Sequence, residues 1–107
     1  MTSTYSFTGP LWRWADQPGA SDGGGWHFVT VPAGPSSDIR DETEGLTRGF
    51  GSVRVEVRIG STTWRTSVFP DAKSGCYVLP VKKAVRRAED VEAGEDVAVE
   101  LTVLEQA

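Results

Sequence analysis

The chain has 107 residues, of which 38% are hydrophobic and 24% charged, an ordinary globular balance in a chain too short for two independent cores. Fifteen acidic and eleven basic residues give a net charge of −4, which opposes binding to nucleic acid or anionic membranes except through a local patch. A lone cysteine excludes an internal disulfide, and no signal-peptide pattern or membrane-length apolar run is present. We therefore expect one domain over residues 1–107, located in the cytoplasm and without a membrane partner.

The first half of the chain predicts two strands and a short helix. Residues 5–14 are rich in aromatic side chains and indicate a strand interrupted by a bulge or an edge at Gly9–Pro10. Residues 26–31 are dense in β-formers and predict its hairpin partner, across a long loop. The segment 33–51 predicts one or two helical turns or an ordered acidic loop, with Ser37 as a helix cap and Gly45 ending the helix early.

The second half predicts four more strands. Residues 52–59 alternate between β-branched and charged side chains, which is typical of a strand with one buried face. Gly60–Ser61 turns the chain into a return strand over 62–69. A short strand follows at 76–79, and a last one with the same alternation at 97–103. Six short strands bury little surface as an open sheet, so we expect a mainly β fold, a small six-stranded barrel with one or two short helices.

Between the last two strands, residues 81–88 predict a helix of about two turns with one apolar face. The residues expected to face the core are Val81, Ala84, Val85 and Ala88, and those expected to face water are Lys82, Lys83, Arg86 and Arg87. Pro80 just before this segment suits a helix start. The basic face has two interpretations, which are a solvated surface paired with the acidic residues after 88 and a patch for anions or nucleic acid.

No catalytic or metal-binding pattern stands out in the sequence. One histidine and one cysteine cannot supply the three or four ligands of a usual zinc site, and Gly23–Gly25 precede a strand rather than a phosphate-binding helix. His27 is either a partly buried strand residue or the base of a Ser-His-Asp arrangement. We expect no metal, no cofactor and no catalytic residues.

Tryptophan is unusually frequent for a chain of this length. Four residues carry it, namely Trp12, Trp14, Trp26 and Trp64. Large aromatic side chains fill the core of a small barrel, or they line a ligand pocket or a partner surface. Alternation places Trp12 and Trp14 on one face, and both interpretations remain open.

Three motifs stand out in the second half of the chain, Trp64-x-Thr66-Ser67, Tyr77-x-Leu79-Pro80-Val81-Lys82 and Gly94-x-Asp96-Val97. They resemble motifs of the bacterial DUF1905 family, a domain of unknown function. The resemblance extends forward through the strand at 7–12 and covers nearly the whole chain. It implies a double-split β-barrel, distantly similar to the AbrB/MazE transcription-factor fold, whose AbrB-like members are swapped dimers that bind DNA.

These observations favour a non-enzymatic binding module for a small molecule or a protein. Its aromatic and basic surface would use Trp26, Trp64, Arg65, Ser67, Lys82 and Arg86. One alternative is an AbrB-like DNA-associated regulator that contacts nucleic acid through Lys82, Lys83, Arg86 and Arg87. Another is a small enzyme or catalytic accessory protein that uses Arg65, Ser67, Lys82 or His27. The sequence is compatible with a monomer or a homodimer.

Overall fold

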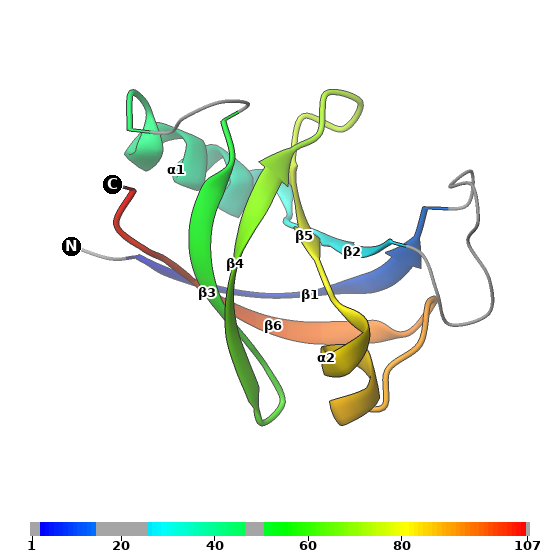
Figure 1. Ribbon diagram of the computed structural model, residues 1–107. Coiled ribbons are helices and arrows are strands. Elements are labelled where there is room, and N and C mark those ends of the chain that lie inside the picture. The colour runs from blue at the N-terminus through cyan, green and yellow to red at the C-terminus, as the bar shows by residue number, and fades with distance from the viewer. Residues whose placement is uncertain (1–2, 15–25, 47–50, 107) are drawn as a thin grey trace.

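The computed structural model describes residues 3–14, 26–46 and 51–106. Within these ranges Figure 1 shows six strands and two helices. In chain order they are β1 (Thr4–Arg13), β2 (His27–Thr30), α1 (Ala33–Thr43), β3 (Val53–Ile59), β4 (Thr62–Pro70), β5 (Tyr77–Pro80), α2 (Lys83–Ala88) and β6 (Asp96–Val103). The predicted loop between the first two strands lies outside the described residues.

The strands form a closed barrel in the order β1-β2-β5-β4-β3-β6, and each neighbouring pair is antiparallel. The long strand β1 closes it, because it pairs with β6 over its first seven positions and with β2 from Leu11 onward. The closure is partial, because β4 pairs with β5 only at Phe69 and Pro70 and has β3 as its one strand partner over residues 62–68 among the described residues. The mainly β, six-stranded barrel expected from the sequence is confirmed.

The expected interruption of the first strand at Gly9–Pro10 is wrong, because β1 runs through both residues. Gly9 and Pro10 lie opposite Val97 and Asp96 of β6, at the end of that ladder. The next residue, Leu11, begins the pairing with β2. Proline has no backbone donor, and the strand tolerates it where β1 passes from one neighbour to the other.

The core consists mostly of branched aliphatic side chains from the inward positions of the strands. β3 and β6 alternate as predicted, with the valines at 53, 55, 57, 97, 99 and 103 buried. None of the four tryptophans belongs to this buried cluster, although Trp64 packs against it while half-buried. Trp14 and Trp26 are 50% and 52% exposed. Small branched residues therefore fill the barrel, and the tryptophans lie around it.

Helix α1 is longer than predicted, with 11 residues and about three turns. Pro32 occupies the cap position without a side-chain cap bond, and Ser37 is exposed inside the helix rather than its cap. The Pro/Gly composition of residues 32–35 suggested a turn, but proline is well tolerated in a first helical turn because its missing donor has no partner there. Ile39 inserts into the core. The end near Gly45 agrees with the prediction.

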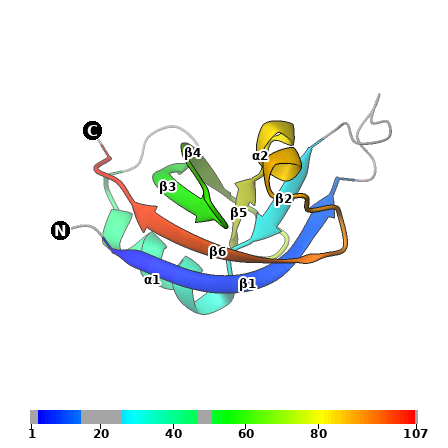
Figure 2. The ribbon, with the colours of Figure 1, turned by 90° about the horizontal axis from the view of Figure 1, so that it is seen from below.

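Helix α2 is shorter than predicted and turns a different side toward the barrel. Val81 and Val85 are buried, but Ala84 and Ala88 are exposed and Arg86 is half-buried. Val81 precedes the helix, whose six residues are too few to present a full apolar stripe. Figures 1 and 2 show α1 and α2 on opposite sides of the barrel. Neither described helix has the length and apolar character needed to cross a membrane.

Candidate ligand pocket beside helix α2

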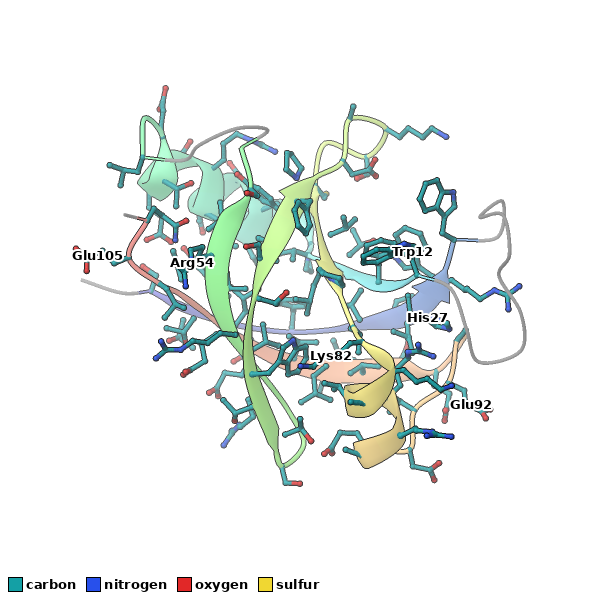
Figure 3. All side chains as sticks on the ribbon, viewed as in Figure 1. Trp12, His27, Arg54, Lys82, Glu92 and Glu105 are labelled. Carbon is teal, nitrogen blue, oxygen red and sulfur yellow. The ribbon has the colours of Figure 1, made fainter. Side chains whose placement is uncertain are left out.

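The end of the β1–β2 hairpin has two chemically different faces. Arg13 lies opposite His27, and the next pair along the ladder is Trp12 and Phe28. Because successive side chains of a strand point to opposite faces, the aromatic pair and the basic pair lie on different sides of the hairpin. Figure 3 shows Trp12 on the outer side and His27 on the side toward α2.

The outer face carries packed aromatic rings. The centroids of Trp12 and Phe28 are 4.9 Å apart, and those of Trp26 and Phe28 are 6.1 Å apart with nearly parallel planes. Trp12 Nε1 donates a hydrogen bond to Thr30 Oγ1 at 3.0 Å. Half-exposed Trp26 extends this cluster toward the hairpin end. The aromatic face thus rests on ordinary cross-strand packing.

Backbone and side-chain hydrogen bonds hold α2 beside the inner face of the hairpin. The backbone N–H of Val81 donates to the carbonyl of His27 at 2.9 Å, which ties the start of the α2 segment to β2. At its other end, Glu89 accepts a hydrogen bond from Thr62 Oγ1 at 2.5 Å and so joins α2 to the β3–β4 turn. The position of the helix is therefore set at both ends.

Between the inner face of the hairpin, α2 and the segment that leads to β6 lies a pocket of about 600 Å³. We call it the α2 pocket. It is lined by Arg13, His27, Lys83, Arg86, Arg87, Asp90, Val91, Glu92 and Ala93. Its volume falls within the usual range for small-ligand sites, roughly 300–1,000 Å³. Among the described lining residues, basic side chains outnumber acidic ones, although the whole chain is acidic.

Two of the basic groups are shielded from solvent, His27 almost fully and Arg86 in part. His27 is 5% exposed, and Arg86 Nη1 lies 3.4 Å from its Nε2 atom. Arginine has no acceptor, so in this contact the guanidinium donates and His27 Nε2 accepts. Arg86 Nε also donates to the carbonyl of Val81 at 3.2 Å. Burial lowers the pKa of Arg86, which reflects the cost of desolvating its charge.

Four charged side chains of the α2 pocket, Lys83, Arg87, Asp90 and Glu92, do not form ion pairs with one another. In the described part of the chain, the ion pairs join Arg58 to Glu100 and Arg65 to Glu56, away from this pocket. Lys83 and Arg87 form no ion pair with a described acid, so for them the expected pairing with the acidic tail is not seen. Lys83 and Arg87 thus share the pocket with Asp90 and Glu92 without pairing to them.

A family model described as "Domain of unknown function (DUF1905)" matches residues 7–101. The chain belongs to the DUF1905 family. A search of curated proteins finds no match. Every residue that lines the α2 pocket lies within the matched range, so the pocket is built entirely from the DUF1905 domain. The family assignment made from the motifs is confirmed.

The six site residues predicted from the sequence lie at different places in the structure. Arg86 lines the α2 pocket, whereas exposed Lys82 does not, and Figure 3 shows Lys82 on the β4 side of α2, across from His27. Trp26 belongs to the aromatic face, and Trp64 packs against the core from β4. Arg65 and Ser67 alternate with Trp64 and face outward, where Arg65 Nε lies 3.3 Å from Glu56 Oε1.

Sequence reasoning missed three charged residues of the pocket, namely Arg13, Asp90 and Glu92. A signal for Arg13 was available, because the predicted hairpin places it near His27. The sequence predicts Asp90 and Glu92 only as members of the acidic segment after residue 88, and no periodicity in that segment indicates where they lie. Within the described ranges, no group of three or more His, Cys, Asp or Glu side chains is arranged to hold a metal ion.

Proposed function

We propose that this DUF1905 domain is a non-enzymatic binding module for a small ligand with an anionic group, which it holds in the α2 pocket. The observation that carries the proposal is the half-buried guanidinium of Arg86 against the buried imidazole of His27. Arg13, Lys83 and Arg87 add positive charge around the same pocket. The chain is expected to act in the cytoplasm, where its single cysteine would stay reduced.

The physical basis is the partial desolvation of Arg86. A guanidinium shielded from water interacts with an anion more strongly than an exposed one, because the surrounding effective dielectric constant is lower. Its planar donors match the geometry of a carboxylate or a phosphate. Since the net charge of the chain is −4, long-range attraction contributes little, and affinity depends on these local contacts.

The position of His27 supports binding rather than catalysis. A general base needs a free acceptor atom within reach of the group it deprotonates. The Nε2 atom of His27 accepts from Arg86 instead. Ser67, the hydroxyl considered from the sequence, lies on β4 and is not part of the pocket lining. His27 therefore orients Arg86, and Arg86 contacts the ligand.

Calorimetric titration with inorganic phosphate and with citrate tests the proposal. The Arg86→Gln variant removes the half-buried charge, and we expect its affinity for the better of the two anions to fall at least tenfold. Lys73→Gln is the matched control, because it removes one positive charge from the exposed β4–β5 turn, away from α2 (Figure 1). Equal losses of affinity in the two variants would contradict the proposal, as would a wild-type protein that binds neither these anions nor any other small carboxylate.

The DNA-binding alternative predicts a different pattern of losses. Phosphate contacts to a duplex would use the exposed Lys82, Lys83 and Arg87, with steep dependence on salt. Lys82→Gln would then weaken DNA binding measurably in a mobility-shift assay, although Lys82 lies outside the pocket. The small-ligand proposal instead expects Lys82→Gln to bind citrate and phosphate like wild-type protein, and no duplex shift at low salt.

A further inference from the structure

The α2 pocket holds acids as well as bases. Asp90 and Glu92, from the segment between α2 and β6, line the same pocket as Arg13, Arg86 and His27. Building on the proposed function, we infer that the natural ligand is a small zwitterion of amino-acid or short-peptide type. Its carboxylate lies against the guanidinium groups, and its ammonium group lies against the carboxylates of Asp90 and Glu92.

The two carboxylates are available to a ligand. Neither Asp90 nor Glu92 forms an ion pair with a described residue, and neither side chain accepts a hydrogen bond from one. A carboxylate that lies beside several cations without pairing to them keeps its acceptor sites open. Asp90 and Glu92 can therefore accept a positively charged group of a ligand.

The backbone keeps the acids close to the bases. Asp90 is the one described non-glycine residue with a left-handed backbone, at φ 53°, and its N–H donates to the Arg87 carbonyl at 3.3 Å. The N–H of Val91 donates to the carbonyl of Arg86 at 3.0 Å. These two bonds fold the chain back at the end of α2, so the backbones of Asp90 and Arg86 stay adjacent. Glu92 is fixed in turn, because its N–H donates to Glu95 Oε1 at 2.7 Å.

Electrostatics distinguishes a zwitterion from a simple anion. An anion attracted by half-buried Arg86 is also repelled by the exposed carboxylates of Asp90 and Glu92, which line the same pocket. A ligand that carries a positive group at the acidic side turns this repulsion into attraction. Val91 and Ala93, which line the pocket between and beside the acids, offer apolar surface to the carbon atoms that join the two groups.

Matched probes separate the contributions of the two charges. We would titrate wild-type protein with glycine, diglycine and triglycine, each also as its N-acetylated acid and as its C-terminal amide. For the length that fits, we expect the zwitterion to bind at least tenfold more tightly than either blocked form. Asp90→Asn combined with Glu92→Gln should abolish the advantage over the N-acetylated acid, and asparagine keeps the left-handed backbone accessible.

Asp41→Asn is the control for charge removal, because Asp41 is an exposed residue of α1 on the other side of the barrel. It should leave the preference for the zwitterion unchanged. Equal binding of the zwitterion and the N-acetylated acid at every length would overturn the inference, as would binding of phosphate or citrate but of none of the peptides. Absence of binding by the peptides and by both anions would instead overturn the proposed function itself.

Discussion

The two helices close opposite sides of the same barrel in different ways. Each sends one aliphatic side chain into the core, Ile39 from α1 and Val85 from α2. Around Ile39 the polar groups are satisfied within the protein, as when Ser36 Oγ donates to the Val31 carbonyl at 2.8 Å. Around Val85 the barrel instead has a charged pocket with a half-buried arginine.

This difference indicates that the α1 side has a structural role and the α2 side a binding role. Polar groups that form hydrogen bonds with one another stabilise the fold and have no free donors or acceptors for a ligand. In the α2 pocket, Lys83, Arg87, Asp90 and Glu92 form no ion pairs with one another, so these side chains are available for recognition. The account therefore predicts that substitutions near α1 change stability without changing ligand binding, and that substitutions in the α2 pocket do the reverse.

The largest expected effect is on the α1 side. Ile39→Ala removes a fully buried side chain and leaves a cavity, which should lower the free energy of unfolding by about 2–5 kcal/mol. Denaturant unfolding measures this loss. Citrate or phosphate affinity of the folded variant should match that of wild-type protein, and a parallel loss of affinity would contradict the separation of the two sides.

Ser36→Ala should have the next largest effect. Ser36 Oγ also accepts a hydrogen bond from the buried N–H of Tyr77 at 3.0 Å, so the substitution leaves that donor without a partner. An unsatisfied buried group costs roughly 1–3 kcal/mol. The neighbouring Ser37→Ala is the control, since Ser37 is exposed and should change the unfolding free energy very little. Similar losses in both variants would argue against this role of Ser36.

Gly60→Ala tests the connection between α2 and the β3–β4 turn. Gly60 has φ 59°, and a methyl group there would collide with the carboxylate of Glu89. The backbone strain alone costs about 1–2 kcal/mol. Gly34→Ala in α1 should not destabilise the protein, because its φ is ordinary and no neighbour lies within 4 Å of the new methyl. A Gly60→Ala protein as stable as wild type would mean that the turn adapts freely.

The smallest effect concerns pH and Tyr5. Burial, followed by the hydrogen bond to Glu42 Oε1 at 2.7 Å and the charge of Glu42, raises the pKa of Tyr5 from 10.0 to about 12. Because the native pKa is the higher one, the stabilisation is complete below pH 10 and is lost as the pH rises toward 12. Unfolding of wild type and Tyr5→Phe should show a stability difference that shrinks over this interval. A difference in unfolding free energy that does not change with pH would contradict the raised pKa of Tyr5.

The strands were predictable because apolar and polar side chains alternate along them, as expected where one face is buried and the other is exposed. The helices were harder. Local composition made Pro32–Pro35 resemble a turn, and only the tertiary position of the segment, with Ile39 in the core, explains the full length of α1. In α2, the helix pattern predicted that Arg86 faces water, but β2 packs beside the helix and covers part of it.

The candidate site was predictable in part. Arg86 followed from the basic segment, and His27 was recognised as a strand residue. The contact between Arg86 and His27 joins positions that are 59 residues apart in the sequence. It depends on the path of the chain from β5 into α2. Long-range contacts of this kind leave no local pattern. The same reason explains why Asp90 and Glu92 were read as part of an acidic tail.

Chemical-shift mapping of wild-type protein by NMR, during titration with citrate and then with diglycine, tests the central claim most directly. The account predicts changes at Arg13, His27, Arg86 and Asp90, with the resonances of α1 and of the outer aromatic pair, Trp12 and Phe28, unchanged. Changes centred on α1 or on the aromatic face, or no changes with either probe, would contradict the conclusion that the α2 side of the barrel is its binding side.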